Sequence, residues 1–207
     1  LESQQREALI QEQITFVESR HEELREAYLE QEQTRVELRR KVAQLTALHR
    51  AGLMFSSTLD REALMQKVLE TLTSDLQYDR AMISFYDPVR QVVKDARVLG
   101  VSPEIQAFAR AREIPVTDPM SPEGIVLLQG QPLLVGDVQA VWDRIHPLNQ
   151  QLALLTQTKA WIAVPLKIKD RILGSLTVDR IQAHSLTQDD LELMMTVAHQ
   201  VAIALDN

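Results

Sequence analysis

The sequence predicts an α+β protein with a largely antiparallel central sheet, preceded by a long N-terminal helix. The segment WIAVPLKIKDRILGSLTVDR, residues 161–180, alternates its side chains on both sides of a short polar tip, as two paired strands do. Residues 1–50 contain no glycine or proline and are dense in Glu, Gln and Arg. Strands fill the centre of the remaining chain and helices its ends, which favours the α+β class.

The composition is that of an ordinary globular protein. The 207 residues are 45% hydrophobic and 25% charged. The net charge of −7 disfavours nucleic acid or an anionic membrane as the main partner. Without cysteine, the chain has no disulfide, thiolate metal site or cysteine nucleophile. No apolar run approaches the roughly 18 to 20 residues that cross a bilayer, and the chain opens on Leu1, so we expect a segment of a longer cytoplasmic, bacterial protein.

An imperfect heptad repeat runs through residues 1–50. Apolar side chains fill two positions of successive heptads, namely Ile10, Ile14, Val17, Leu24, Tyr28, Leu38, Val42 and Leu45. Such a seam predicts a coiled-coil helix over residues 1–50. We expect this helix to pair with that of a second copy in a parallel homodimer. Apolar residues off the seam, such as Phe16 and Leu29, leave a four-helix arrangement open. The other alternative is a solvated, unpaired charged helix.

Residues 51–207 form the second predicted domain. Its strands are expected at 81–86, 91–99, 133–135, 161–166 and 172–178. Its helices are expected at 61–76 behind an Asp60 cap, at 103–112, and after Thr187, where Asp190 completes a capping box. The residues 113–132 read as an ordered loop with a brief helix, 141–158 as partly helical, and 45–58 as a continuation of the helical period.

Alternation assigns the side chains of the 161–180 hairpin to two faces. One face is apolar and contains Ile162, Val164, Leu166, Leu176 and Val178. The other face mixes a tryptophan with small and polar residues, as a small-molecule pocket does: Trp161, Ala163, Ser175, Thr177 and Asp179. The alternative, held equally open, is that Trp161 only fills core beneath residues 113–158.

Four segments, in order and over residues 45–207, resemble GAF domains. They are the opening helix pair at 48–76, GQP to GDV at 130–138, the hairpin sequences AVPL and LGSLTV at 163–178, and the closing helix at 186–207. The resemblance implies a GAF-like central antiparallel sheet with helices on both faces, a ligand pocket on one side and dimer-forming helices on the other. It thereby places Met194, Val201 and Leu205 of the last helix at a dimer interface.

The resemblance also implies pocket-covering residues outside the hairpin. Asp137, Trp142 and His146 stand where such residues occur in the family. His146 would hydrogen-bond a ligand or, as the weaker option, ligate haem iron; the alternative is a surface or capping histidine. The family's cyclic-nucleotide signature cannot be placed on this sequence. Its cysteine-linked bilin and its methionine sulfoxide reduction both need a cysteine that this chain lacks.

The sequence offers no strong catalytic pattern. The five histidines show no HExxH spacing, so we expect no metal site. Asp189 and Asp190 occupy a first helical turn, where they serve the cap and the helix dipole. We therefore predict a non-enzymatic regulatory domain that binds a small molecule of unknown identity and relays its state through dimer helices to an attached output domain. The alternative is a ligandless dimerisation and spacer module.

Overall fold

The computed structural model describes residues 11, 15–35, 38, 39, 41 and 60–206, and the chain divides into two units, Leu1–Ala47 and Leu48–Asn207. In the first unit, residues 15–35 form a helix. Four of the predicted seam residues, Ile10, Ile14, Val42 and Leu45, lie outside the described residues, as does the predicted helical stretch 45–58. Across the described helices, none combines the length and apolarity needed to cross a membrane.

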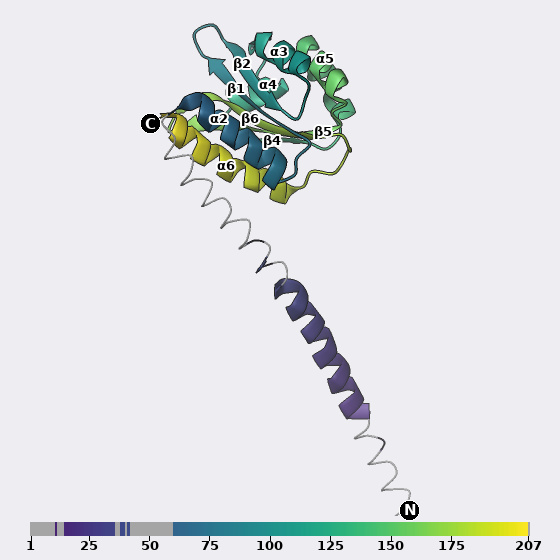
Figure 1. The fold of residues 1–207 in the computed structure, drawn as a ribbon. Helices are drawn as coiled ribbons and strands as arrows, with labels where there is room; N and C mark the ends of the chain where they lie inside the picture. The colour runs from purple at the N-terminus through teal and green to yellow at the C-terminus, as the bar shows by residue number, and fades with distance from the viewer. Residues whose placement is uncertain (1–10, 12–14, 36–37, 40, 42–59, 207) are drawn as a thin grey trace, which may run out of the picture. The chain divides into compact units, whose positions relative to one another are not determined.

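The second unit is built on one six-stranded antiparallel sheet (Figure 1). Its strands are β1 (Arg80–Asp87), β2 (Val92–Leu99), β3 (Ile114–Pro115), β4 (Leu133–Val135), β5 (Ala160–Ile168) and β6 (Arg171–Arg180), in the spatial order β3-β2-β1-β6-β5-β4. The hairpins β1–β2 and β5–β6 meet at the centre, where Arg80 pairs with Asp179 and Phe85 with Gly174. The predicted antiparallel sheet and its five longer strands are confirmed.

One face of the sheet is covered by α2 (Arg61–Glu70) and α6 (Gln188–Asp206), which lie side by side in Figure 1. The apolar face predicted for the hairpin packs here: Ile162, Val164 and Leu166 are fully buried with Leu176 and Val178. Burial of such side chains is worth about 1.5 to 3 kcal/mol each. This face therefore holds the main core of the domain.

The ends of the two covering helices follow the predicted caps. Asp60 accepts a hydrogen bond from the Glu62 amide at 3.0 Å, and α2 continues through one π-helical turn, Thr71–Asp75. At α6, the Thr187 amide and hydroxyl both donate to the Asp190 carboxylate at 2.8 Å. The capping box is confirmed.

The opposite face is covered by short helices from the long connections of the chain. They are α3 (Pro103–Ala111), α4 (Pro122–Leu127), the 3-10 helix η2 (Val138–Arg144) and α5 (Pro147–Thr156). In Figure 1, α3, α4 and α5 lie across the sheet from α2 and α6. Pro103, Pro122 and Pro147 each stand at the first position of a helix, where the missing amide proton costs nothing. Helices therefore cover both faces, as expected.

Candidate functional site

A cavity of about 140 Å³ lies between the sheet and this second helical layer. The floor comes from β1, β5 and β6, and the roof from α4, α5 and the segment that ends α3. Much of the wall is aliphatic, with Val93, Ile114, Val126, Leu127 and Leu152 among its residues. A dry cavity of about 150 Å³ in another protein binds benzene, so this volume suits a molecule of that size.

At one end of the cavity stands a buried ion pair. Arg80 Nη2 lies 2.6 Å from Asp179 Oδ1, and the two side chains are only 9% and 18% exposed. Burial raises the pKa of the Asp179 carboxyl above its ordinary value, although its hydrogen bond to Arg80 and the charge of that residue oppose the shift. Within the described part of the chain, Arg80 Nε has no hydrogen-bond partner. The pair is thus desolvated and incompletely bonded.

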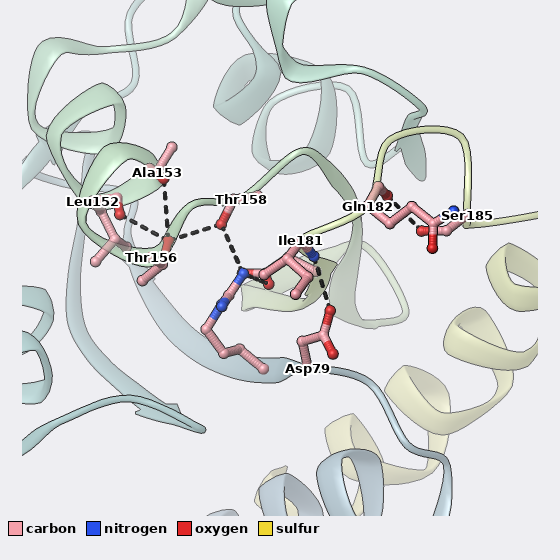
Figure 2. A network of polar contacts seen from close by, with 10 residues as sticks. Asp79, Leu152, Ala153, Thr156, Thr158, Ile181, Gln182 and Ser185 are labelled. Carbon is pink, nitrogen blue, oxygen red and sulfur yellow. Dashed lines mark hydrogen bonds and ion pairs between the residues drawn. The ribbon is translucent and has the colours of Figure 1, made fainter.

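Two threonines extend this ionic group into the roof (Figure 2). The Thr158 hydroxyl accepts from Arg80 Nη2 at 3.3 Å and donates to Asp179 Oδ2 at 3.2 Å. Its oxygen lies 2.8 Å from that of Thr156, which in turn lies 2.8 Å from the Leu152 carbonyl oxygen. Figure 2 shows the chain of contacts from the end of α5 to the sheet. The network ties α5 to the strands beneath the cavity.

The sheet floor carries a second polar pair between the same two strands. Ser84 on β1 and Ser175 on β6 are buried, with their hydroxyl oxygens 2.9 Å apart. One hydroxyl donates to the other, and this hydrogen bond joins the two strands. Along β1 and β6 the floor therefore carries an ionic pair, the Met82–Thr177 pair and a hydroxyl pair in succession.

The other polar end of the cavity is formed by Arg112, Asn149 and Glu123. Arg112 Nη1 donates to Asn149 Oδ1, and the Asn149 amide nitrogen donates to Glu123 Oε1. Arg112 also donates from Nε to the Ala109 carbonyl oxygen and from Nη2 towards Met82 Sδ, both at 3.3 Å. Burial lowers the pKa of Arg112 to about 10, against the opposing charge of Glu123. The guanidinium remains charged near neutral pH.

The structure brings together the five residues predicted from the hairpin. Trp161, Ala163, Ser175, Thr177 and Asp179 all line the cavity. Asp137, Trp142 and His146 are not among the lining residues. The Asp137 carboxylate instead accepts from the Gln139 amide at 2.9 Å, and His146 Nδ1 from the Leu148 amide at 3.3 Å. Both side chains cap the helix that follows them.

The three residues of α6 that were expected at a dimer interface lie instead against the core of their own chain. Met194 and Val201 are fully buried on the sheet of their own chain, and Leu205 is partly buried against the same core. They therefore pack within one molecule, which differs from the dimer contact expected of them. The outward-facing apolar residues of α6 are Met195 and Ile203, which are 47% and 38% exposed.

Sequence reasoning missed the charged groups supplied by β1 and by the α3 end. Arg80, Met82 and Ser84 follow one another at every second position of β1 and all line the cavity. Applying the alternation rule to β1 would have found them. Arg112, Asn149 and Thr158 lie at or between element ends, where no periodicity marks a side chain's direction.

An antiparallel sheet with paired terminal helices on one face and a walled, partly charged cavity on the other defines an α+β domain with room for a small ligand. The GAF domain family model matches residues 60–205. This chain therefore belongs to the GAF domain family. Significant similarity to a curated protein was not found.

Solved structures share the fold at low sequence identity. The GAF domain of an Acinetobacter phosphoenolpyruvate-protein phosphotransferase has a TM-score of 0.63 and 14% identity, over 79% of this chain and 93% of that chain. The free methionine-R-sulfoxide reductase from Neisseria meningitidis has a TM-score of 0.64 and 18% identity, over 79% of this chain and 88% of that chain. Residues 122 to 287 of a methyl-accepting chemotaxis protein have a TM-score of 0.60 and 18% identity, over 75% of this chain and 94% of that chain.

Proposed function

We propose that this chain is a regulatory signal-transduction domain that binds a small molecule in the cavity and relays the bound state through dimer helices to an attached output domain. The observation that carries the proposal is the cavity itself, whose aliphatic wall holds charged groups at two ends. Proteins rarely bury charged groups without a role, because desolvating them is costly. The similar domain of a chemotaxis protein fits a signalling role.

A regulatory role is favoured over a catalytic one by the chemistry of the lining residues. The Arg80 and Asp179 charges neutralise each other, and the two serines bond to each other. The chain has no cysteine to supply a thiol. Such groups orient a ligand, and a ligand then shifts a conformational equilibrium by its difference in affinity for the two states.

The helix 15–35 supports the homodimer part of the proposal. At its heptad positions Val17, Leu24 and Tyr28 are 63%, 72% and 62% exposed, so the helix by itself presents an apolar stripe. A second copy would cover the stripe by coiled-coil pairing. Light scattering at micromolar concentration should give a dimer mass, which Leu24→Glu reduces to a monomer. The same change off the seam, Leu29→Glu, should leave the dimer intact; dissociation by both would move the interface off this seam.

Native mass spectrometry tests the ligand. Freshly purified protein should carry an additional small mass that is lost on denaturation, or should acquire one from a metabolite extract. Thr177→Glu, which places a charge in the cavity, should abolish that mass, whereas Thr117→Glu on the surface should retain it. A wild-type protein that stays bare in both experiments would favour the ligandless dimerisation module instead.

A further inference from the structure

The buried Arg112 guanidinium has only neutral acceptors. The residue is 7% exposed and lines the cavity. Its hydrogen bonds go to an amide oxygen of Asn149, a backbone carbonyl of Ala109 and the sulfur of Met82. The thioether is a weak acceptor. A buried cation normally has a carboxylate partner, since burial without one is costly.

The acidic group whose charge acts on Arg112, Glu123, does not supply that partner. Glu123 is half-buried and reaches Arg112 only through Asn149, which accepts from the guanidinium and donates to the carboxylate. None of the ion pairs among the described residues includes Arg112. Asn149 thus occupies the position that a carboxylate would take, and an amide is the weaker acceptor of the two.

The charged groups at the opposite end of the wall already neutralise each other. Arg80 lies opposite Asp179 on the paired strand and forms an ion pair with it at 2.6 Å. Between this pair and Arg112 the wall is mostly aliphatic, with Val98, Ile114 and Val126 facing the cavity. The cavity therefore combines a short apolar body with one positive group, Arg112, which the wall carboxylate of Glu123 reaches only through Asn149.

We propose that the cavity binds a small apolar monocarboxylate whose carboxylate takes the place of the Asn149 side chain on Arg112. The inference rests on the proposed ligand-binding function and names the ligand's chemical class. The planar guanidinium can hold a carboxylate by two parallel hydrogen bonds, a geometry that neither an amide nor an alcohol reproduces. The cavity volume of about 140 Å³ limits the apolar body to a short branched chain or one small ring.

Three probes with one carbon skeleton separate charge from shape: isovalerate, isovaleramide and isopentylamine. Wild-type protein is refolded from denaturant to remove carried-over ligand, and each probe is titrated to millimolar concentration by calorimetry and methyl NMR. We expect isovalerate to bind about tenfold or more tightly than the amide, and isopentylamine to bind weakest. The methyl signals of the lining residues Ala153 and Ala163 should shift.

Arg112→Gln should remove the preference for isovalerate, while Arg110→Gln, which changes an exposed arginine in the last turn of α3, should retain it. Circular dichroism and thermal melting establish that both variants fold. If Arg112→Gln does not fold, the three-probe comparison on wild-type protein still decides the question. It needs no variant.

Equal binding of isovalerate and isovaleramide, tighter binding of the amine, or a preference that survives in folded Arg112→Gln would overturn the carboxylate class. In each of those cases the cavity still binds a small molecule, so the proposed function stands. Failure of all three probes to bind or to shift the cavity methyl signals would overturn the inference alone, because native mass spectrometry tests the binding of other ligands separately.

Discussion

Arg80 and Asp179 face each other across the central strands β1 and β6, with 2.6 Å between the guanidinium and carboxylate atoms. This relationship places an ion pair on the inner wall of an otherwise mostly aliphatic cavity. A buried ion pair gains little stability over a well-packed apolar pair, because desolvation offsets the attraction. Its position beside a cavity thus fits a role in recognition better than a role in folding.

Breaking this pair on one side should destabilise the domain strongly. Asp179→Asn leaves the Arg80 guanidinium buried without its counter-charge, and we expect a loss of about 3 kcal/mol in urea unfolding. The double change Arg80→Met with Asp179→Leu should recover most of that loss. Glu113→Gln, which breaks the solvent-exposed pair with Arg90, is the control and should change stability little. A single change at Asp179 that costs nothing would contradict this account.

At Gly174 the backbone of β6 lies close against that of β1. A Cβ atom at this position would lie 1.9 Å from the Ser84 carbonyl oxygen and 2.9 Å from Phe85 Cα, both in the backbone of the neighbouring strand. Gly174→Ala should therefore separate the strands and cost about 3 kcal/mol or more of stability. Gly136→Ala is the matched control: its nearest neighbour is the His184 side chain at 3.1 Å, which can move. Equal unfolding midpoints for the two variants would show that the sheet tolerates the contact.

Tyr78 should make the domain sensitive to alkaline pH. Its buried hydroxyl donates to Asp190 Oδ1 at 2.9 Å, and burial, aided by the Asp190 charge, raises its pKa above the ordinary value of 10.0. Below pH 10.0 the phenol is protonated in both states and its contribution is complete. As the pH rises further the unfolded chain ionises first, so stability falls until the folded-state pKa is passed.

Tyr78→Phe should accordingly lose about 1 kcal/mol at neutral pH and show a shallower decline above pH 10.0. Tyr86→Phe removes the hydroxyl of a half-buried tyrosine on β1 and should keep the wild-type decline. Urea midpoints measured between neutral and alkaline pH provide the comparison. Parallel decline in all three proteins would assign the alkaline sensitivity to other groups.

The hairpin could be read from sequence because its two faces differ in chemistry. Strand geometry turns successive side chains to opposite sides, so Ile162 and Trp161 could be assigned to opposite faces without a structure, although a pocket and a filled core stayed equally open for the Trp161 face. The same rule extends to Arg80 on β1. Alternation depends only on the backbone geometry of the strand itself, so it holds regardless of how the rest of the chain folds.

The roof of the cavity could not be read in that way. Arg112 follows α3 and Asn149 opens α5, and only the three-dimensional path of the connections brings them together. His146 and Asp137 were expected to cover the pocket, yet each precedes a helix, where a side-chain acceptor commonly caps free amides. A cap depends only on the residues next to it in the sequence, so it could be predicted. A place in the pocket depends on the path of the whole chain, so it could not.

Ala163 offers a test that fills the cavity without adding charge. Its methyl group lines the cavity in a small cluster with Val116, Val126 and Leu127. Ala163→Leu would place three more carbon atoms in that space and raise the stability of the ligand-free protein by about 1 kcal/mol, because new apolar surface is buried without displacing neighbours.

The same change should abolish binding of small molecules, because the added carbons occupy the volume that a ligand needs. Ala111→Leu adds the same atoms at an exposed position of α3 and should alter neither property. Thermal melting and the titrations of the three probes measure both effects. Undiminished binding by Ala163→Leu would place the ligand outside this cavity, and a marked loss of stability would mean that the wall cannot accommodate three additional carbons.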